Sequence, residues 1–173
     1  MSQLRVAILT LSDKGSRGER VDESGPALSA WLADRGAQTV HAHVIADEFD
    51  QIVQVLSDWA DRDLADLILS TGGTGVSPRD VTPEATMQVC SRMIPGIGEL
   101  MRQASLKITP MASLSRAVAG IRHQSLIINL PGSPKGAVEN LEAVWPTIGH
   151  AVEKIRGGQE DCGGRFDRKT RFI

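Results

Sequence analysis

Two acidic residues stand where they could hold a divalent cation. Asp47 follows the alternating apolar segment 39–45, and Asp80 closes a loop that begins after the apolar run 67–69. In phosphate-handling sites Mg²⁺ takes one or two carboxylates and completes its shell with phosphate oxygens and water. The pair therefore indicates metal-assisted phosphoryl or nucleotidyl transfer. The alternative is that each acid begins a helix or is a solvated loop charge.

The loop 71–75 has the sequence Thr-Gly-Gly-Thr-Gly and could bind an anion. Three glycines let the backbone turn sharply, so that several N–H groups can point at one spot, and the two threonines add hydroxyl donors. Arg79 lies between this turn and the next helix start, which adds a cation. The loop is neither a Walker loop nor a dinucleotide fingerprint. A tight structural turn is the alternative.

A second loop, 129–135, also has residues suited to phosphate. Two prolines stiffen it, Gly132 permits close approach of the backbone to a ligand, and Lys135 supplies a positive charge. The alternative is an ordinary loop that ends a strand. Histidine and cysteine indicate no metal site: His41 and His43 share a strand face but are only two ligands, and no cysteine belongs to a close pair. Cys90 and Cys162 are expected to be reduced thiols.

Apolar runs alternate with helix-period segments along the chain, which predicts an α/β fold of parallel strands with crossover helices. Ligands of such sheets bind outside the carboxyl ends of the strands, so the loops 12–16, 46–48, 71–80 and 129–135 should meet at one edge. The expected strands are 6–11, 39–45, 67–69 and 126–129. Helices are expected to begin at Ser24 and Thr82, as caps, to include 52–59, and to cover 99–107 and 138–155, whereas 108–122 fits no clear period.

Length and composition limit the function classes. The 173 residues suit one domain, which we expect over 1–156, followed by a tail of uncertain order over 157–173. A net charge of -2 with no long block of one sign argues against a protein that coats nucleic acid, and 3% aromatic residues leave few stacking platforms. No segment reaches the roughly 20 apolar residues of a membrane span. Since the N-terminus also lacks a signal-peptide pattern, we expect a cytoplasmic protein.

Several stretches together resemble the molybdopterin adenylyltransferase family, which includes MogA- and MoaB-like proteins and the G domain of gephyrin. They are 71–75, 78–86, 105–110, 114–116 and 129–132, and the likeness runs in order over about residues 4–155. The resemblance implies a three-layer α/β sandwich around a mostly parallel sheet. It also implies a homotrimer that hands its product to a molybdate-insertion protein.

The reaction that the resemblance implies is transfer of AMP from Mg·ATP to the terminal phosphate of molybdopterin, with release of pyrophosphate. Asp47 and Asp80 would be the catalytic acids, acting through Mg²⁺. In this sequence Ala46 precedes Asp47, where the family commonly has proline. The expected nucleotide-binding residues are Thr71, Gly72, Gly73, Thr74, Gly75, Pro131, Gly132 and Ser133, and the expected substrate-binding residues are Ser12, Asp13, Ser105, Ser115 and Asn129.

Two other functions stay open from the sequence. One is a non-catalytic, MoaB-like protein that binds molybdopterin and transfers nothing, which binding without ATP turnover would indicate. The other is a nucleotide-binding regulator unrelated to pterins, which tight ATP binding without a thermal shift by molybdopterin would indicate.

Overall fold

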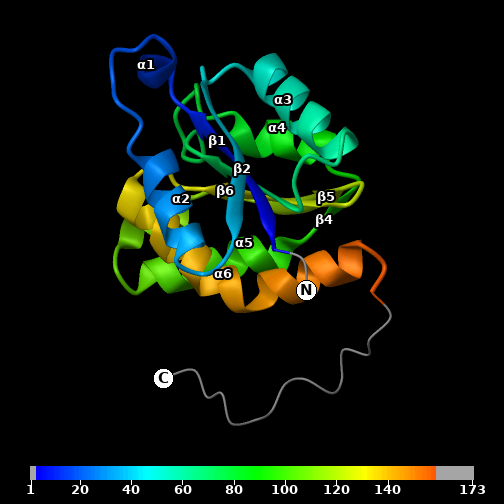
Figure 1. Cartoon of the computed structure of the whole chain (residues 1–173). Coiled ribbons are helices and arrows are strands. Elements are labelled where there is room, and N and C mark those ends of the chain that lie inside the picture. The colour runs from blue at the N-terminus through cyan, green and yellow to red at the C-terminus, as the bar shows by residue number, and fades with distance from the viewer. Residues whose placement is uncertain (1–2, 159–173) are drawn as a thin grey trace.

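A computed structural model describes residues 3–158 of the chain. Its centre is a six-stranded sheet in the order β2-β1-β3-β6-β5-β4 (Figure 1). Strands β2, β1, β3 and β6 are parallel, whereas β5 is antiparallel to β6 and β4 is antiparallel to β5. The strands are β1 (Arg5–Leu11), β2 (Gln38–Ile45), β3 (Leu67–Thr71), β4 (Arg92–Met93), β5 (Ala119–Arg122) and β6 (Ser125–Leu130).

Helices cover both faces of the sheet, as Figure 1 shows, so that the fold has three layers. One face packs against α3 and α4, and the other packs against α2, α5 and α6. The three-layer prediction is therefore confirmed. The helices are α1 (Asp13–Ser16), α2 (Ser24–Ala33), α3 (Phe49–Asp61), α4 (Thr82–Val89), α5 (Pro95–Leu106) and α6 (Pro134–Ile155), with a 3-10 helix η1 (Pro110–Leu114).

The three central strands are apolar on both faces because each face has its own helix layer. Along β1, Val6 and Ile8 belong to the core beneath α2, α5 and α6, while Ala7 and Leu9 belong to the core beneath α3 and α4. This alternation fixes the register of the strand, since a slip by one residue would exchange the two sets. The buried sheet holds the strand ends, and therefore the loops after them, in fixed positions.

Two helix starts differ from the sequence prediction. Ser24 does not cap α2: its amide and that of Gly25 donate to Oδ1 of Asp22, at 3.0 and 3.1 Å, so Asp22 satisfies the free donors there. Thr82 does not cap α4 either, because its hydroxyl donates 3.0 Å to the carbonyl oxygen of Gly72. The sequence assigns both hydroxyls to local helix ends, whereas the Thr82 hydroxyl bonds back to the loop 71–75 and the Ser24 hydroxyl bonds to Gly132.

Other boundaries also differ from the prediction. Pro95, which the sequence suggests as an interruption, is in the first turn of α5, where a missing N–H costs nothing. The unassigned stretch 108–122 contains η1 and β5. The expected tail 157–173 lies almost entirely outside the described residues, as does Cys162. None of the helices within 3–158 is long and apolar enough to cross a membrane.

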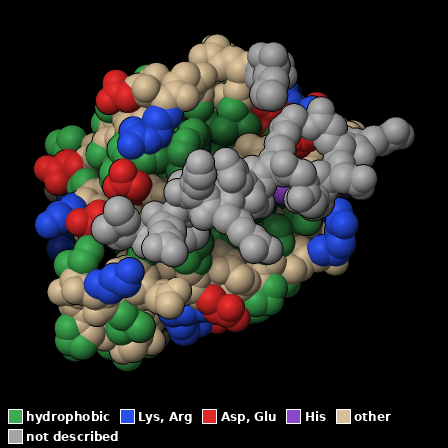
Figure 2. All heavy atoms as spheres, turned by 90° about the horizontal axis from the view of Figure 1, so that it is seen from below, with side chains coloured by type: hydrophobic (Ala, Val, Ile, Leu, Met, Phe, Trp, Pro, Cys, Tyr) green, Lys and Arg blue, Asp and Glu red, His purple; other side chains and the backbone are tan. Residues whose placement is uncertain are grey.

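Charged side chains of both signs are interspersed on the face of the molecule that Figure 2 shows. That face belongs to the lower helix layer of Figure 1, which contains α5 and α6. The mixture agrees with the small net charge of the sequence. Among the described residues visible on this face, the charges form no broad positive surface of the kind that follows a nucleic-acid backbone.

Candidate functional site

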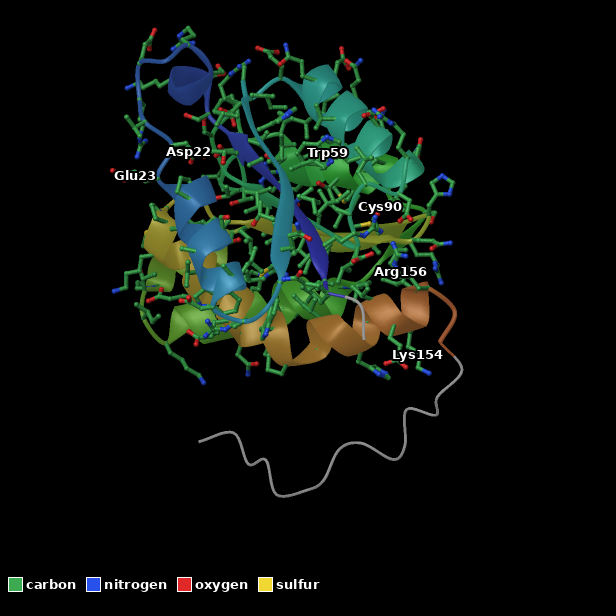
Figure 3. All side chains as sticks on the ribbon, viewed as in Figure 1. Asp22, Glu23, Trp59, Cys90, Lys154 and Arg156 are labelled. Atoms are coloured by element: carbon green, nitrogen blue, oxygen red, sulfur yellow. The ribbon has the colours of Figure 1, made fainter. Side chains whose placement is uncertain are left out.

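Two adjoining cavities lie at the edge of the sheet where the parallel strands end. The first, of about 360 Å³, is lined by Asp22, Glu23, Asp47 and Asp80 together with Gly72 and Gly73, and we call it the acidic cavity. Figure 3 shows Asp22 and Glu23 where the chain enters α2. The second, of about 390 Å³, is lined by apolar residues of the segment 108–114 and by polar residues of α5 and α6, and we call it the apolar-walled cavity. Ser133 lines both cavities.

Asp47 is held by reciprocal hydrogen bonds with Asp13. The amide of Asp13 donates 3.0 Å to Oδ2 of Asp47, and the amide of Asp47 donates 3.1 Å to Oδ1 of Asp13. Burial raises the pKa of Asp47, and the charges of Asp13 and Asp80 raise it further, against the opposing effects of the Asp13 amide and of Arg79. The ionised carboxylate is therefore disfavoured in the ligand-free protein, and a bound cation would stabilise it.

Asp80 is held by a tight loop and lines the same cavity. Its Oδ2 accepts a hydrogen bond of 2.8 Å from the amide of Ser77, and its own amide donates 2.9 Å to the Ser77 carbonyl. A Cβ at Gly75 would come within 2.9 Å of Oδ2 of Asp80. From the same loop, Arg79 donates 2.8 Å both to Oδ1 of Asp13 and to Glu48, and its hydrogen bonds hold the pKa of Asp13 below its usual value. The arginine therefore connects the loops that carry the two acids.

The loop 71–75, which we call the glycine loop, lies next to both acids and needs glycine at positions 72 and 73. Gly72 has φ +110°, and a Cβ there would overlap the carbonyl oxygen of Leu11. Gly73 has φ +61°, and a Cβ there would overlap the Thr82 hydroxyl and lie 3.0 Å from Oδ1 of Asp47. Among the described residues, the amides of Gly73, Thr74 and Gly75 donate no hydrogen bond. Three consecutive free amides beside a cavity make an anion-binding backbone.

The loop 131–133 forms the opposite wall and is tied to the glycine loop. The Thr71 hydroxyl donates 2.7 Å to the carbonyl of Pro131, and the Ser24 hydroxyl donates 2.8 Å to the carbonyl of Gly132. A Cβ at Gly132 would lie 3.3 Å from Cα of Gly72, so the two backbones are close. Ser133 caps α6 by accepting 3.2 Å from the amide of Gly136.

The residues around the acidic cavity fit Mg²⁺ better than a metal with a full set of protein ligands. Oδ1 of Asp47 and Oδ1 of Asp80 accept no hydrogen bond within 3–158, so each carboxylate has one oxygen free. No group of three or more His, Cys, Asp or Glu side chains suited to a metal occurs in the described part of the chain. Mg²⁺ is usually held by one or two carboxylates together with phosphate oxygens and water, which is the set of ligands that this cavity could provide with a bound phosphate.

Basic and hydroxyl side chains line the apolar-walled cavity beside exposed apolar ones. Arg102 donates 2.9 Å to the carbonyl of Ala117, and the Ser105 hydroxyl accepts 2.9 Å from Nδ2 of Asn140. Met111 is 64% exposed at this rim. Ser115 and Lys135 complete the polar part of the lining. The cavity therefore offers apolar walls together with donors suited to a ring system and a phosphate.

The predicted nucleotide-binding residues are divided between the two cavities. The sequence places them in one set, whereas the loops 71–75 and 131–133 each contribute to both linings. Of the predicted substrate residues, Ser105 and Ser115 line the apolar-walled cavity, Ser12 lines the acidic cavity, and Asp13 lines neither and lies behind Asp47. Thr71, Gly72, Gly73 and Gly132 line the acidic cavity, and Thr74, Gly75 and Pro131 line the apolar-walled one.

Sequence reasoning missed several residues at these cavities. Arg102 lies one helical turn before Ser105 on α5, a spacing that places both on one face and could have revealed it. Asp22 precedes the helix start and has the residue type of a cap. Asn140, in the second turn of α6, has no such signal, because only the tertiary structure brings it to Ser105.

Residues 7–150 match the family described as "Probable molybdopterin binding domain". The chain belongs to that family. It is 47% identical over 159 residues to a protein named molybdopterin adenylyltransferase from Helicobacter pylori strain J99, covering 91% of this chain and 90% of the relative. A protein of the same name from Escherichia coli K12 is 44% identical over 154 residues, covering 88% and 79%.

A solved structure shares the fold of this family member. The molybdopterin biosynthesis enzyme MoaB of Thermus thermophilus superposes with a TM-score of 0.84 at 52% identity, covering 90% of this chain and 98% of that one. Such similarity over nearly the full length supports the three-layer fold around a mostly parallel sheet that is described above.

Asn129 lies in β6 of this family member without touching either cavity. Its side chain is fully buried: Nδ2 donates 2.9 Å to the Ser70 hydroxyl and 2.8 Å to the Thr86 hydroxyl, and Oδ1 accepts 3.3 Å from the amide of Val118. The geometry therefore favours a role in joining β3, α4 and the segment before β5, in place of the substrate contact that the sequence suggests.

Replacing Asn129 by Ala is expected to lower the free energy of unfolding by about 2–3 kcal/mol, because buried hydrogen-bonding groups lose their partner. Urea denaturation measures this. Ser115→Ala is the comparison. It should leave the free energy of unfolding nearly unchanged and weaken the binding of molybdopterin, because Ser115 lines the apolar-walled cavity. An Asn129→Ala protein of unchanged stability with weakened binding of molybdopterin would contradict the structural role.

The raised pKa of Asp47 predicts how stability depends on pH. Because the pKa is higher in the folded than in the unfolded chain, the ionised carboxylate lowers stability, and this loss develops as pH rises through the folded pKa. We therefore expect Asp47→Asn to raise the thermal midpoint of the ligand-free protein at neutral pH. The gain should shrink toward about pH 4, near the unfolded pKa. A lower midpoint for the variant at neutral pH would contradict this assignment.

Proposed function

We propose that this protein transfers AMP from Mg·ATP to the terminal phosphate of molybdopterin and releases pyrophosphate. The observation that carries the proposal is the pair Asp47 and Asp80 in the acidic cavity, next to a loop whose three free amides run from Gly73 at this cavity to Thr74 and Gly75 at the apolar-walled one. The relatives named molybdopterin adenylyltransferase, at 44–47% identity, support the choice of substrates. Family membership supports binding of the pterin itself.

The two cavities suggest which substrate binds where. We assign the nucleotide to the acidic cavity, because carboxylates can bind a triphosphate only through a cation and the glycine loop supplies amides for the phosphates. We assign molybdopterin to the apolar-walled cavity, where Arg102, Ser105 and Ser115 can bind its polar groups and Met111 can cover its ring. The shared wall at Ser133 then lies between the reacting phosphates.

In the proposed reaction, an oxygen of the molybdopterin phosphate attacks the α-phosphorus of ATP, and the bond from that phosphorus to the oxygen it shares with the β-phosphate breaks. Asp47 and Asp80 would hold Mg²⁺, which supplies charge neutralisation on the phosphates when bound. The free amides of the loop 73–75 stabilise the added negative charge, and the walls of the two cavities align the attack. Catalysis of this kind needs positioning and electrostatics and no protein nucleophile.

The experiment is incubation of the purified protein with molybdopterin, ATP and Mg²⁺. Adenylylated molybdopterin and pyrophosphate should appear in equal amounts, and a chelator should abolish both. Molybdopterin binding with no ATP binding and no product would refute the transfer and favour a non-catalytic pterin-binding protein instead.

We also propose that the protein acts as a homotrimer in the cytoplasm and passes its product to a molybdate-insertion protein. The family resemblance supports this. Sedimentation at several protein concentrations tests the assembly. A monomer at all of them would refute it.

A further inference from the structure

One side chain outside both cavities is bonded to both ends of the loop that carries Asp80. Nε of Arg116 donates 2.6 Å to the carbonyl of Gly75, and a terminal nitrogen of the same guanidinium donates to the carbonyl of Asp80 itself. The backbone amide of Arg116 donates 2.9 Å to the carbonyl of Thr74. Arg116 therefore fixes the start and the end of the segment 74–80, although it lies 36 residues further along the chain than Asp80.

The remaining guanidinium nitrogen pairs with Glu84 in the first turn of α4. Oε2 of Glu84 is buried and has no hydrogen-bond partner among the described residues. A half-exposed ion pair contributes little to stability. What Glu84 does is fix the plane of the guanidinium, so that the other two nitrogens point at the carbonyls of Gly75 and Asp80.

The position of the Asp80 carboxylate depends on that backbone. Its Oδ2 is bonded to the amide of Ser77, and the Asp80 amide is bonded back to the Ser77 carbonyl, so the carboxylate moves only with the loop. Arg79, the residue before Asp80, pairs with Asp13, but its side chain is 51% exposed and makes no bond to Asp80. Arg116 contacts Asp80 directly through its carbonyl.

We propose that Arg116 is a positioning residue that holds the Asp80 carboxylate at the acidic cavity, with Glu84 orienting its guanidinium. The proposal rests on the function proposed above, because it assigns Arg116 to the site of the Mg·nucleotide. It follows that a lysine cannot replace Arg116, since one ammonium cannot reach two carbonyls and a carboxylate in a fixed plane.

The test compares Arg116→Lys with Arg122→Lys. Arg122 is a matched control: it also bonds one carboxylate, Asp61, and one backbone carbonyl, that of Val89, and its side chain is 27% exposed against 36% for Arg116. It ends β5 opposite the amino end of β6, away from the cavities. Both variants lose comparable contacts, so any difference between them belongs to the site.

Two measurements are made on each variant and on wild type. Hydrogen exchange at the amides of Ser77 and Asp80, which are bonded within the loop, should become faster in Arg116→Lys and stay unchanged in Arg122→Lys. Calorimetric binding of ATP with Mg²⁺ should weaken roughly ten- to a hundredfold in Arg116→Lys, as for partners that orient metal ligands. Glu84→Gln should also speed hydrogen exchange in the loop and weaken ATP binding, each by less than Arg116→Lys does. In an Asp80→Asn background, Arg116→Lys should weaken binding no further.

Unchanged exchange at the amides of Ser77 and Asp80 in Arg116→Lys would overturn the proposal. Faster exchange with unchanged Mg²⁺-dependent ATP binding would also overturn it, because the loop would then be held without consequence for the site. Wild-type protein that binds no ATP with Mg²⁺ would refute the proposed function and, with it, the link from Arg116 to the nucleotide. ATP binding and normal transfer in Arg116→Lys would refute the positioning role alone.

Discussion

Asp80→Asn is expected to lower the rate of adenylyl transfer by about 10²–10³-fold, which corresponds to about 3–4 kcal/mol of transition-state stabilisation. The amide keeps the shape of the side chain and its bond to the Ser77 amide, but it loses the charge that would hold Mg²⁺ beside the phosphates. The rate of pyrophosphate release at saturating ATP and molybdopterin measures the effect. Thermal unfolding should show a folded protein.

Asp50→Asn is the matched control, because it makes the same chemical change in the first turn of α3, three residues after Asp47 and outside both cavities. Its transfer rate should equal that of wild type. If Asp80→Asn transferred AMP at the wild-type rate, Asp80 would not be a metal ligand, and the assignment of the acidic cavity to Mg·ATP would be wrong.

Gly72→Ala is expected to destabilise the protein by about 3 kcal/mol or more, because a methyl group adds backbone strain at φ +110° to an overlap with the Leu11 carbonyl. The overlapping atom is backbone of a buried strand and cannot move aside as a flexible side chain would. Urea denaturation measures the loss. In a domain of this size it should lower the thermal midpoint by roughly 6–12 °C.

Gly36→Ala is the control that separates the backbone strain at positive φ from the overlap with the Leu11 carbonyl. Gly36 has φ +75°, and a Cβ there would meet nothing within 4 Å, so only the conformational cost of about 1–2 kcal/mol remains. Equal destabilisation by the two substitutions would show that the contact with Leu11 costs nothing. The glycine at position 72 would then be needed only for its backbone conformation.

The centre of the sheet could be predicted from the sequence because its strands are continuous apolar runs between helix-period segments. β3 and β6 are examples, since every residue in them is buried. The antiparallel edge could not be predicted. β4 has only two residues, Arg92 and Met93, and β5 contains Gly120, where a Cβ would come within 2.6 Å of the Cys90 sulfur. Strands that short are defined by their neighbours and have no periodicity of their own.

The meeting of Asp47 and Asp80 followed from the rule that parallel strands end at one edge. That they line one cavity is a finding of the structure, and their roles in binding metal remain a prediction. The role of Arg116 could not be read from sequence, because its partners Gly75 and Asp80 lie 41 and 36 residues away. The cap predictions were wrong because Thr82 and Ser24 have the residue types of local caps, yet the Thr82 hydroxyl bonds back to Gly72 and the Ser24 hydroxyl bonds to Gly132, 108 residues away.

The two cavities meet at Ser133, which lines both, next to the close approach of Gly132 to Gly72. Under the proposed reaction, the product joins the occupants of both cavities in one covalent molecule. When one half of the product is bound in its cavity, the other half is kept at high effective concentration near its own cavity. The adenylylated pterin should therefore dissociate more slowly than either substrate, so that turnover depends on its removal by the next protein.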